Sequence, residues 1–448
     1  MVAALAAPGA ASAAIGAHCE GANIEAQGAS TQKLAHQTVW GPTFNTSPAA
    51  TACNGTQGSK GTPTVKYNST GSGAGLKAFG AEGATPDYKN NAFVGTDEAP
   101  DAAQKAEIET HAAGAEPKSL ETIPVEQVAI AVVMHLPDGC KAENETGVGA
   151  YKGRLALNDT TIESIYRGTL TKWSEIKAAG DKLTCTGGKA EEESSIIPVV
   201  RKDQSGTSHI FKTFLAAINK TSFTAEAFPV GCPSALPEET KTWAQMDQGC
   251  ENQRWPTAAK VVHAAAEGGG AVAKEVEKTP SSISYLNLAD ARSNKSFTPG
   301  VGGAHTAKFW AIVQNKTAEP FTYADPATNK DVEKLGNANC SKTVYTDGKT
   351  EFPPASTREL WNEAQAALNE VKYPLCGLTY DLALRQYSKY GGGLETSLGE
   401  ATTVENYLLY AVTSSKEAGS FFLKNHDYEK LPTNVKKLSE KGIKEIQF

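Results

Sequence analysis

Ten consecutive residues of this chain read Val199-Val200-Arg201-Lys202-Asp203-Gln204-Ser205-Gly206-Thr207-Ser208. Apolar positions in residues 209–215 recur at helical spacing, so a strand is predicted to turn into a helix that begins near Ser205. The free N–H groups of a first helical turn and the positive end of the helix dipole favour a bound oxyanion. Arg201 adds a planar set of donors, and Asp203 is spaced to lock them in place. An ordinary N-cap beside a surface arginine is the alternative, and partners elsewhere in the chain must decide between the two.

Two upstream segments supply such partners. Residues 65–79 predict a strand, a Gly-Ser-Gly-Ala-Gly turn and the start of a helix, which together offer the Ser72 hydroxyl and backbone amides. Residues 92–100 predict a short buried strand that runs into a turn and leaves Asp97 at its end. A dinucleotide site is disfavoured because Leu76 stands where the third glycine of that fingerprint belongs. A hydrolase nucleophile at Ser205 is disfavoured because Asp203 stands where the nucleophile elbow needs glycine.

Composition excludes several classes of protein. The chain has 448 residues, 40% of them hydrophobic, which is enough for two cores and predicts two or three domains. Its 43 basic and 50 acidic residues give a net charge of −7, so no general attraction for nucleic acid or other anions is expected. No apolar run approaches the roughly 20 residues of a transmembrane helix. The eight histidines are scattered, and neither a metal site nor a cofactor site is predicted.

The beginning of the chain indicates export. Residues 1–18 are almost all small or apolar, and Ala11-Ser12-Ala13-Ala14 is typical of the end of a secretory signal. A basic segment is missing, so residues 1–18 are interpreted as a signal-peptide remnant or a flexible tail. Lipidation of Cys19 stays open, but His18 fits poorly before a lipidated cysteine and a disulfide is preferred. We therefore expect a periplasmic or extracellular protein.

The eight cysteines support an oxidising compartment, because their number is even and no Cys-x-x-Cys pair occurs. Connectivity cannot be deduced from sequence alone. Proximity along the chain favours sequential pairs that staple local loops. The predicted pairs are Cys19 with Cys53, Cys140 with Cys185, Cys232 with Cys250, and Cys340 with Cys376.

Three motifs taken together resemble the phosphate-binding protein of bacterial ABC transporters, the PstS family. They are Gly-Ser-Gly-x-Gly at 71–75, Gly-x-Asp-x-Ala-Pro at 95–100 and Arg-x-Asp-x-Ser-Gly-Thr at 201–207. Residues 153–173, 279–285 and 373–380 are also similar to family segments in order and approximate spacing. About half of the chain carries the resemblance, and the rest reads as insertion.

The resemblance implies an α/β, two-lobed periplasmic-binding-protein-like fold of type II, in which helices flank mixed sheets and the ligand cleft lies between the lobes. The apolar, β-branched residues 123–136 read as one long buried strand. In the family the corresponding strand crosses between lobes. Residues 19–130 and 373–448 would then form lobe I, and residues 131–372 would form lobe II. Insertions at 40–62, 221–256 and 288–350 are predicted to be surface loops.

The resemblance also implies the ligand contacts. Asp97 is the discriminating one, because a carboxylate only accepts hydrogen bonds and so favours an oxyanion that still carries a proton. The N-terminal contact departs from the family pattern, since Thr31 replaces an aromatic residue and changes the shape of the pocket. Asp203 is expected to orient Arg201. The implied phosphate contacts are Ser30, Thr31, Ser72, Asp97, Arg201, Ser205, Gly206 and Thr207.

We therefore expect a monomeric, exported solute-binding protein that captures inorganic phosphate and delivers it to the membrane permease of an ABC transporter. An enzyme such as a phosphatase is not expected, because the chain offers no nucleophile or metal set. A cell-surface or filament-forming protein on the same scaffold, with a vestigial or structural phosphate site and assembly through its insertions, is the alternative. Arsenate or a phosphate ester as the better ligand stays open.

Overall fold

The computed structural model describes residues 21–46, 63–111, 120–144, 153–176, 181–186, 194–227, 237–297, 307–316, 321–329, 336–340, 372–387, 398–413, 416 and 418–447. The structural features given below belong to those residues. Cys19, Cys53, Cys232 and residues 1–18 lie outside them, and so do the predicted pairs that involve these cysteines.

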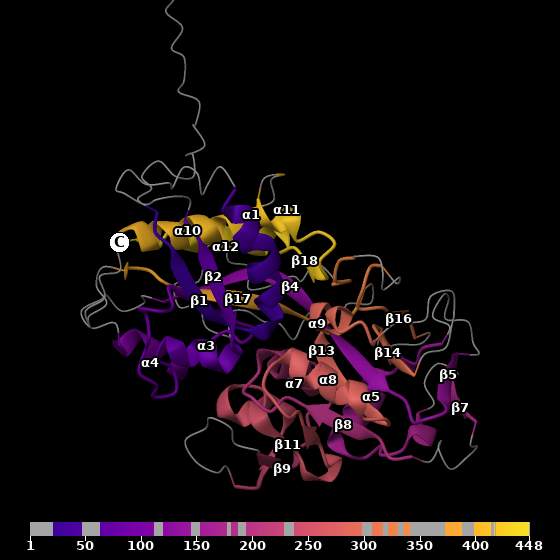
Figure 1. Ribbon diagram of the computed structural model, residues 1–448. Coiled ribbons are helices and arrows are strands. Elements are labelled where there is room, and N and C mark those ends of the chain that lie inside the picture. The colour runs from indigo at the N-terminus through magenta and orange to yellow at the C-terminus, as the bar shows by residue number, and fades with distance from the viewer. Residues whose placement is uncertain are drawn as a thin grey trace, which may run out of the picture.

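A ten-stranded mixed sheet organises the chain (Figure 1). Its strand order is β12-β8-β13-β4-β17-β3-β1-β2, and β14 and β18 also pair with β4. In chain order the strands are β1 (Ile24–Gly28), β2 (Val65–Ser69), β3 (Phe93–Thr96), β4 (Leu120–His135), β8 (Ile197–Val200), β12 (Val262–His263), β13 (Ser282–Asn287), β14 (Lys308–Trp310), β17 (Cys376–Leu384) and β18 (Tyr428–Glu429).

Strand β4 joins the two parts of this sheet. All of its 16 residues are buried, as the apolar run in the sequence predicts, and this length is well above the usual strand. Its first part, Leu120–Ala129, pairs antiparallel with β17, and its second part, Ile130–His135, pairs antiparallel with β13. In Figure 1, β4 runs from the part of the molecule that contains α10 and α12 toward β14 and β13.

Helices flank both parts of the sheet, which gives the predicted α/β class. Parallel strands β1, β2 and β3 lie on one side of β4, and parallel strands β8, β12 and β13 lie on the other. The helices of the first part are α3 (Ser72–Ala78), α4 (Ala102–His111), α10 (Leu398–Val412), α11 (Gly419–Phe422) and α12 (Thr433–Ile443), and those of the second are α5 (Asp159–Arg167), α7 (Gly206–Ile218), α8 (Gly269–Lys278) and α9 (Leu288–Ser293).

The prediction that residues 221–256 form a surface loop is wrong. Within this range the structure describes residues 221–227 and 237–256, and these contain a small sheet of order β10-β9-β11, with strands β9 (Phe223–Ala227), β10 (Glu239–Lys241) and β11 (Arg254–Pro256). Trp243 and Trp255 are buried in it. The segment folds because Lys212 of α7 is buried beneath it and binds three of its backbone carbonyls, those of residues 246, 252 and 254, at 3.0, 2.7 and 2.6 Å. Burial lowers the pKa of Lys212 well below its ordinary value.

Further parts of the predicted insertions are also structured. Residues 40–46 continue the π-helix Ala35–Trp40 into α1 (Gly41–Phe44), and the side chains of Trp40 and Phe44 are buried. Residues 288–293 form α9, which packs against β13 and β4. Residues 308–310 form β14, which pairs with β4, and the side chains of Phe309 and Trp310 are buried. The predicted insertions therefore include several segments that contribute to the core.

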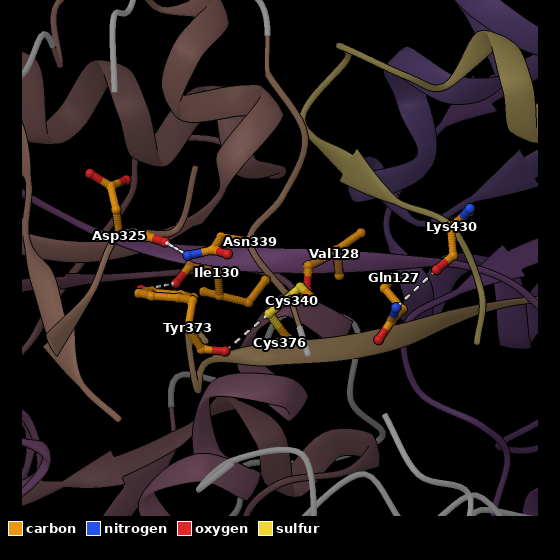
Figure 2. The surroundings of a disulfide bond; sticks show 9 residues. All are labelled: Gln127, Val128, Ile130, Asp325, Asn339, Cys340, Tyr373, Cys376 and Lys430. Atoms are coloured by element: carbon orange, nitrogen blue, oxygen red, sulfur yellow. Dashed lines mark hydrogen bonds between the residues drawn. A yellow bond between two sulfur atoms is a disulfide. The ribbon is translucent and has the colours of Figure 1, made fainter. Parts of the chain in front are cut away.

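Two of the predicted disulfides are present. Cys140–Cys185 joins β5 (Cys140–Asn144) to its antiparallel partner β7 (Asp181–Cys185). Cys340–Cys376 ties residue 340 to the first residue of β17, close to the point where β4 changes partner (Figure 2). The Tyr373 hydroxyl donates a 2.7 Å hydrogen bond to the carbonyl of Ile130 at the same point. No helix within the described ranges is long and apolar enough to cross a bilayer.

Candidate oxyanion-binding site

The polar residues singled out in the sequence meet where several strands end. Ser30 and Thr31 follow β1, Ser72 begins the helix after β2, and Asp97 follows β3. Arg201 follows β8 on the other side of β4. Ligands in open α/β sheets bind outside the carboxyl ends of the strands, which is where these residues lie. The side chains of Ser30, Thr31, Ser72, Asp97, Arg201, Asp203, Ser205 and Thr207 are all buried.

The two sides of the site touch at Gly206. A Cβ atom built on Gly206 would lie 2.4 Å from Cβ of Asp97 and 2.5 Å from Oγ of Ser72. The backbone N–H of Gly73 also donates to the carbonyl of Gln204, at 3.4 Å. Glycine at position 206 therefore lets the start of α7 approach the Ser72 and Asp97 side to within a few ångströms.

Arg201 is held by a carboxylate two residues later. Its Nε donates to Oδ1 of Asp203 at 2.8 Å, and its Nη2 donates to Oδ2. Its Nη1 reaches Oγ of Ser30 at 3.5 Å and Oγ1 of Thr207 at 3.4 Å. Burial lowers the pKa of Arg201, but the adjacent Asp203 outweighs that effect and the pKa is raised. The guanidinium is therefore charged and fixed, with its Nη1 edge among hydroxyls.

Asp97 lies on the opposite side of β4 from Arg201, and hydroxyl groups surround it. The Thr31 hydroxyl donates to its Oδ1, and its backbone N–H donates to Oγ of Ser72 at 3.1 Å. The carbonyl of Thr31 accepts hydrogen bonds from Nδ2 of Asn287 at 3.0 Å and from the Tyr428 hydroxyl at 2.6 Å. These bonds fix the turn after β1, so Thr31 presents its hydroxyl to the carboxylate.

Helix α7 begins as the sequence predicts, with Ser205 as N-cap. The Ser205 Oγ accepts from the backbone N–H of Ser208 at 3.3 Å, and the Ser208 hydroxyl pairs with that of Tyr285 at 2.7 Å. The remaining N–H groups of a first turn carry no intrahelical partner and point along the helix axis. The site therefore combines one cation, several hydroxyls, a helix N-terminus and one carboxylate, a set that suits a small, partly protonated oxyanion.

Sequence inspection missed Asn252, which holds the N-cap residue. Its Oδ1 accepts from the backbone N–H of Ser205 at 3.1 Å, and its Nδ2 donates to the carbonyl of Ser205 at 2.7 Å. The same Nδ2 lies 3.4 Å from Oε2 of Glu98, the residue next to Asp97. No sequence pattern links positions 205 and 252, so only the folded chain reveals this contact.

Two carboxyl groups beside the site have shifted pKa values. Burial raises the pKa of Glu98 to about 7, against the opposing charge of His209 and the N–H of Gly249. Burial also raises the pKa of Asp290 on α9 to about 6, and Arg201 opposes that rise. Both groups add negative charge near the site only where the pH exceeds these values.

Residues 16–389 match the PBP superfamily domain, so the chain belongs to the PBP superfamily. Solved structures share its fold over almost its whole length. A phosphate-binding protein from Stenotrophomonas maltophilia is 15% identical, with a TM-score of 0.57 over 93% of each chain. A human phosphate-binding apolipoprotein is 16% identical, with a TM-score of 0.56 over 92% of each chain. The periplasmic phosphate-binding protein PfluDING, bound with phosphate, is 17% identical, with a TM-score of 0.53 over 92% of each chain. The predicted two-lobed α/β fold is confirmed.

Replacing Asn252 by alanine should destabilise the protein by about 3 kcal/mol, because the N–H and C=O of Ser205 would stay buried without their partner. Urea denaturation followed by circular dichroism measures the loss. Asn90→Ala is the control, since Asn90 is exposed and its side-chain amide donates to the exposed carboxylate of Asp87; it should change stability by less than about 0.5 kcal/mol. Equal effects of the two changes would contradict a supporting role for Asn252.

Proposed function

We propose that this chain is an extracytoplasmic solute-binding protein that captures inorganic phosphate and delivers it to an ABC transporter. The observation that carries the proposal is the buried juxtaposition of the Arg201–Asp203 pair and the α7 N-terminus with Asp97 and Ser72. The fold shared with proteins that bind phosphate agrees with it. Titration calorimetry with phosphate and then sulfate, on protein freed of anions by unfolding and refolding, tests it directly.

The proposed phosphate contacts come from both sides of β4. Arg201 and the first turn of α7 donate hydrogen bonds to the anion, Ser72 supplies a hydroxyl, and Asp97 accepts the hydrogen of the P–O–H group. Asp203 orients Arg201 without touching the ligand. The full set is Ser30, Thr31, Ser72, Asp97, Arg201, Ser205, Gly206 and Thr207.

We further propose that the lobes close on the ligand as rigid units, residues 19–130 with 373–448 against residues 131–372. The change of partner along β4, from β17 to β13 at Ala129 and Ile130, supports these boundaries. A ligand that contacts both lobes stabilises the closed population. Each half of the site alone should bind weakly.

Export agrees with the disulfides, which persist in oxidising compartments. A binding role rather than catalysis agrees with the superfamily and with the binding proteins that share the fold. A structural protein with a vestigial site is not favoured, because the Arg201–Asp203 pair and the Asp97–Ser72 pair are both buried and the start of α7 meets the second pair at Gly206.

Asp97→Asn should bring the affinity for sulfate closer to that for phosphate. The carboxylate accepts from a protonated oxyanion and repels one that lacks a proton, and an amide removes this repulsion. Calorimetric titration of both anions into both proteins measures the ratio of dissociation constants. An unchanged preference for phosphate would remove Asp97 from the selectivity of the site.

Arg201→Ala should weaken phosphate binding by at least a hundredfold, because the anion would lose a buried, preorganised cation. Lys202→Ala is the matched control, since Lys202 carries the same charge one residue along the chain and is partly exposed; it should change affinity by less than about threefold. Similar losses in both variants would mean that general surface charge holds the anion.

Gly206→Ala should weaken phosphate binding by at least tenfold, because the added methyl group would overlap Asp97 and Ser72 when the two sides approach. Gly270→Ala provides the comparison, since Gly270 is exposed, lies in α8 and has open space around its Cβ position. Its affinity should stay at the wild-type value in the same titration. Wild-type affinity in Gly206→Ala would show that phosphate binds without this close approach.

A further inference from the structure

Residues 237–256 form a compact unit that is fastened to α7, and we name them the clamp segment. The buried ammonium of Lys212 binds the carbonyls of Met246, Asn252 and Arg254, and it lies 4.2 Å above the ring of Trp255. A second anchor is the 2.9 Å contact between Nδ1 of His209 and the carbonyl of Asp247. The clamp segment must therefore move with α7 and with Ser205 at its N-terminus.

The clamp segment also reaches the opposite side of the cleft. The backbone N–H of Gly249 donates to Oε1 of Glu98 at 2.8 Å. Nε2 of Gln248 donates to the carbonyl of Ala99 at 3.2 Å and to Oε1 of Gln104 at 3.1 Å. Glu98 and Ala99 lie on the turn after β3 that also holds Asp97, and Gln104 lies on α4, the helix that follows this turn. None of these hydrogen bonds involves a residue assigned to the ligand.

A second row of contacts runs beside the first. Oε1 of Glu82 accepts from Nε2 of Gln204 at 2.7 Å and from Nε2 of Gln104 at 3.1 Å. Lys77 lies 3.4 Å from the other oxygen of Glu82 and balances its charge. Gln204 immediately precedes Ser205, so this row also links the anion-binding loop to the opposite side.

We propose that the clamp segment is a built-in latch, in which Gln248, Gly249 and Asn252 engage Glu98 and Gln104 and so hold the cleft closed around the ligand. The identity of the anion in this proposal rests on the proposed function, but the hydrogen bonds of the latch do not depend on which anion is bound. Asn252 and Glu98 act as positioning residues, because one holds Ser205 and the other adjoins Asp97.

The hydrogen bonds across the cleft join residues that are not assigned to the ligand, and this has a measurable consequence. Hydrogen bonds that form only on closure raise the closed population for every anion by the same factor. Loss of the latch should therefore weaken phosphate and arsenate equally and leave the preference for phosphate over sulfate unchanged. It should act mainly by speeding ligand release, since the open form still meets the anion in the same way.

Glu98 gives the latch a dependence on pH. The groups that face it are His209 of α7, the N–H of Gly249, Glu82 and Asp247. Burial raises its pKa to about 7 in this closed arrangement, whereas an open cleft would return the carboxyl toward its ordinary value. Closure thus takes up a proton. The contribution of Glu98 to the stability of the closed form is complete at low pH and is lost as the pH rises through about 7.

The first test compares Gln248→Ala with Gln245→Ala by calorimetry and by stopped-flow release of phosphate. Gln248→Ala removes two hydrogen bonds across the cleft and should weaken phosphate binding about tenfold, with faster release. Gln245 lies three residues earlier, is exposed and bonds Thr242 of its own segment, so Gln245→Ala should stay within about twofold. Equal affinities in the two variants would overturn the latch.

The second measurement is the pH profile of Glu98→Gln, whose amide keeps the shape of the side chain but carries no charge. The dissociation constant of the wild type divided by that of Glu98→Gln should rise about tenfold between about pH 6 and pH 8.5. A constant ratio would exclude Glu98 as the titrating group of closure.

Hydrogen exchange at the Gly249 amide separates the latch from the proposed function. If the wild type binds no phosphate, the proposed function fails, but this amide should still be protected in the wild type and exchange faster in Gln248→Ala. Equal exchange in both proteins would overturn the latch whatever the ligand.

Discussion

A buried charge has to be matched by partners, and the pairing of Arg201 with Asp203 meets this need for the whole site. Arg201 is only 2% exposed, so without Asp203 its burial would be prohibitive. The pairing also means that the arginine brings no net charge to the ligand, and Asp97 adds a negative one. In the proposed site an anion would be held by oriented N–H groups, hydroxyls and the dipole of α7 rather than by excess positive charge. A chain of net charge −7 can carry such a site.

Strand β4 turns this local chemistry into a two-sided site. Because its partner changes from β17 to β13 at Ala129 and Ile130, the strands that precede Asp97 and Arg201 belong to one continuous sheet yet lie on opposite sides of β4. The Cys340–Cys376 disulfide and the Tyr373 hydroxyl brace the chain at this junction. A brace beside the crossing strand limits how the two sides move and favours motion as rigid units.

The parts of the fold that sequence predicts are those that local patterns encode. The strand at 120–135, the helix start at Ser205 and the pairing of Arg201 with Asp203 all follow from spacing within a few residues. The sheet of β9, β10 and β11 was not predicted because the polar composition of its segment is typical of loops, while the buried Lys212 binds carbonyls that lie 34 to 42 residues further along the chain. Asn252 was missed for the same reason, since a single amide far along the chain carries no local signal.

Recognition and closure therefore rest on different groups in this protein. The residues assigned to the anion lie at the ends of β1, β2, β3 and β8, whereas Gln248 and Gly249 of the clamp segment reach across to Glu98, Ala99 and Gln104, which are not assigned to the anion. Affinity is the product of the intrinsic fit of the site and the fraction of molecules that are closed. A segment that changes only the second factor can tune how tightly the ligand is held without altering which ligand is chosen. A segment fastened to α7 by a buried lysine and a histidine is a simple way for the fold to acquire that control.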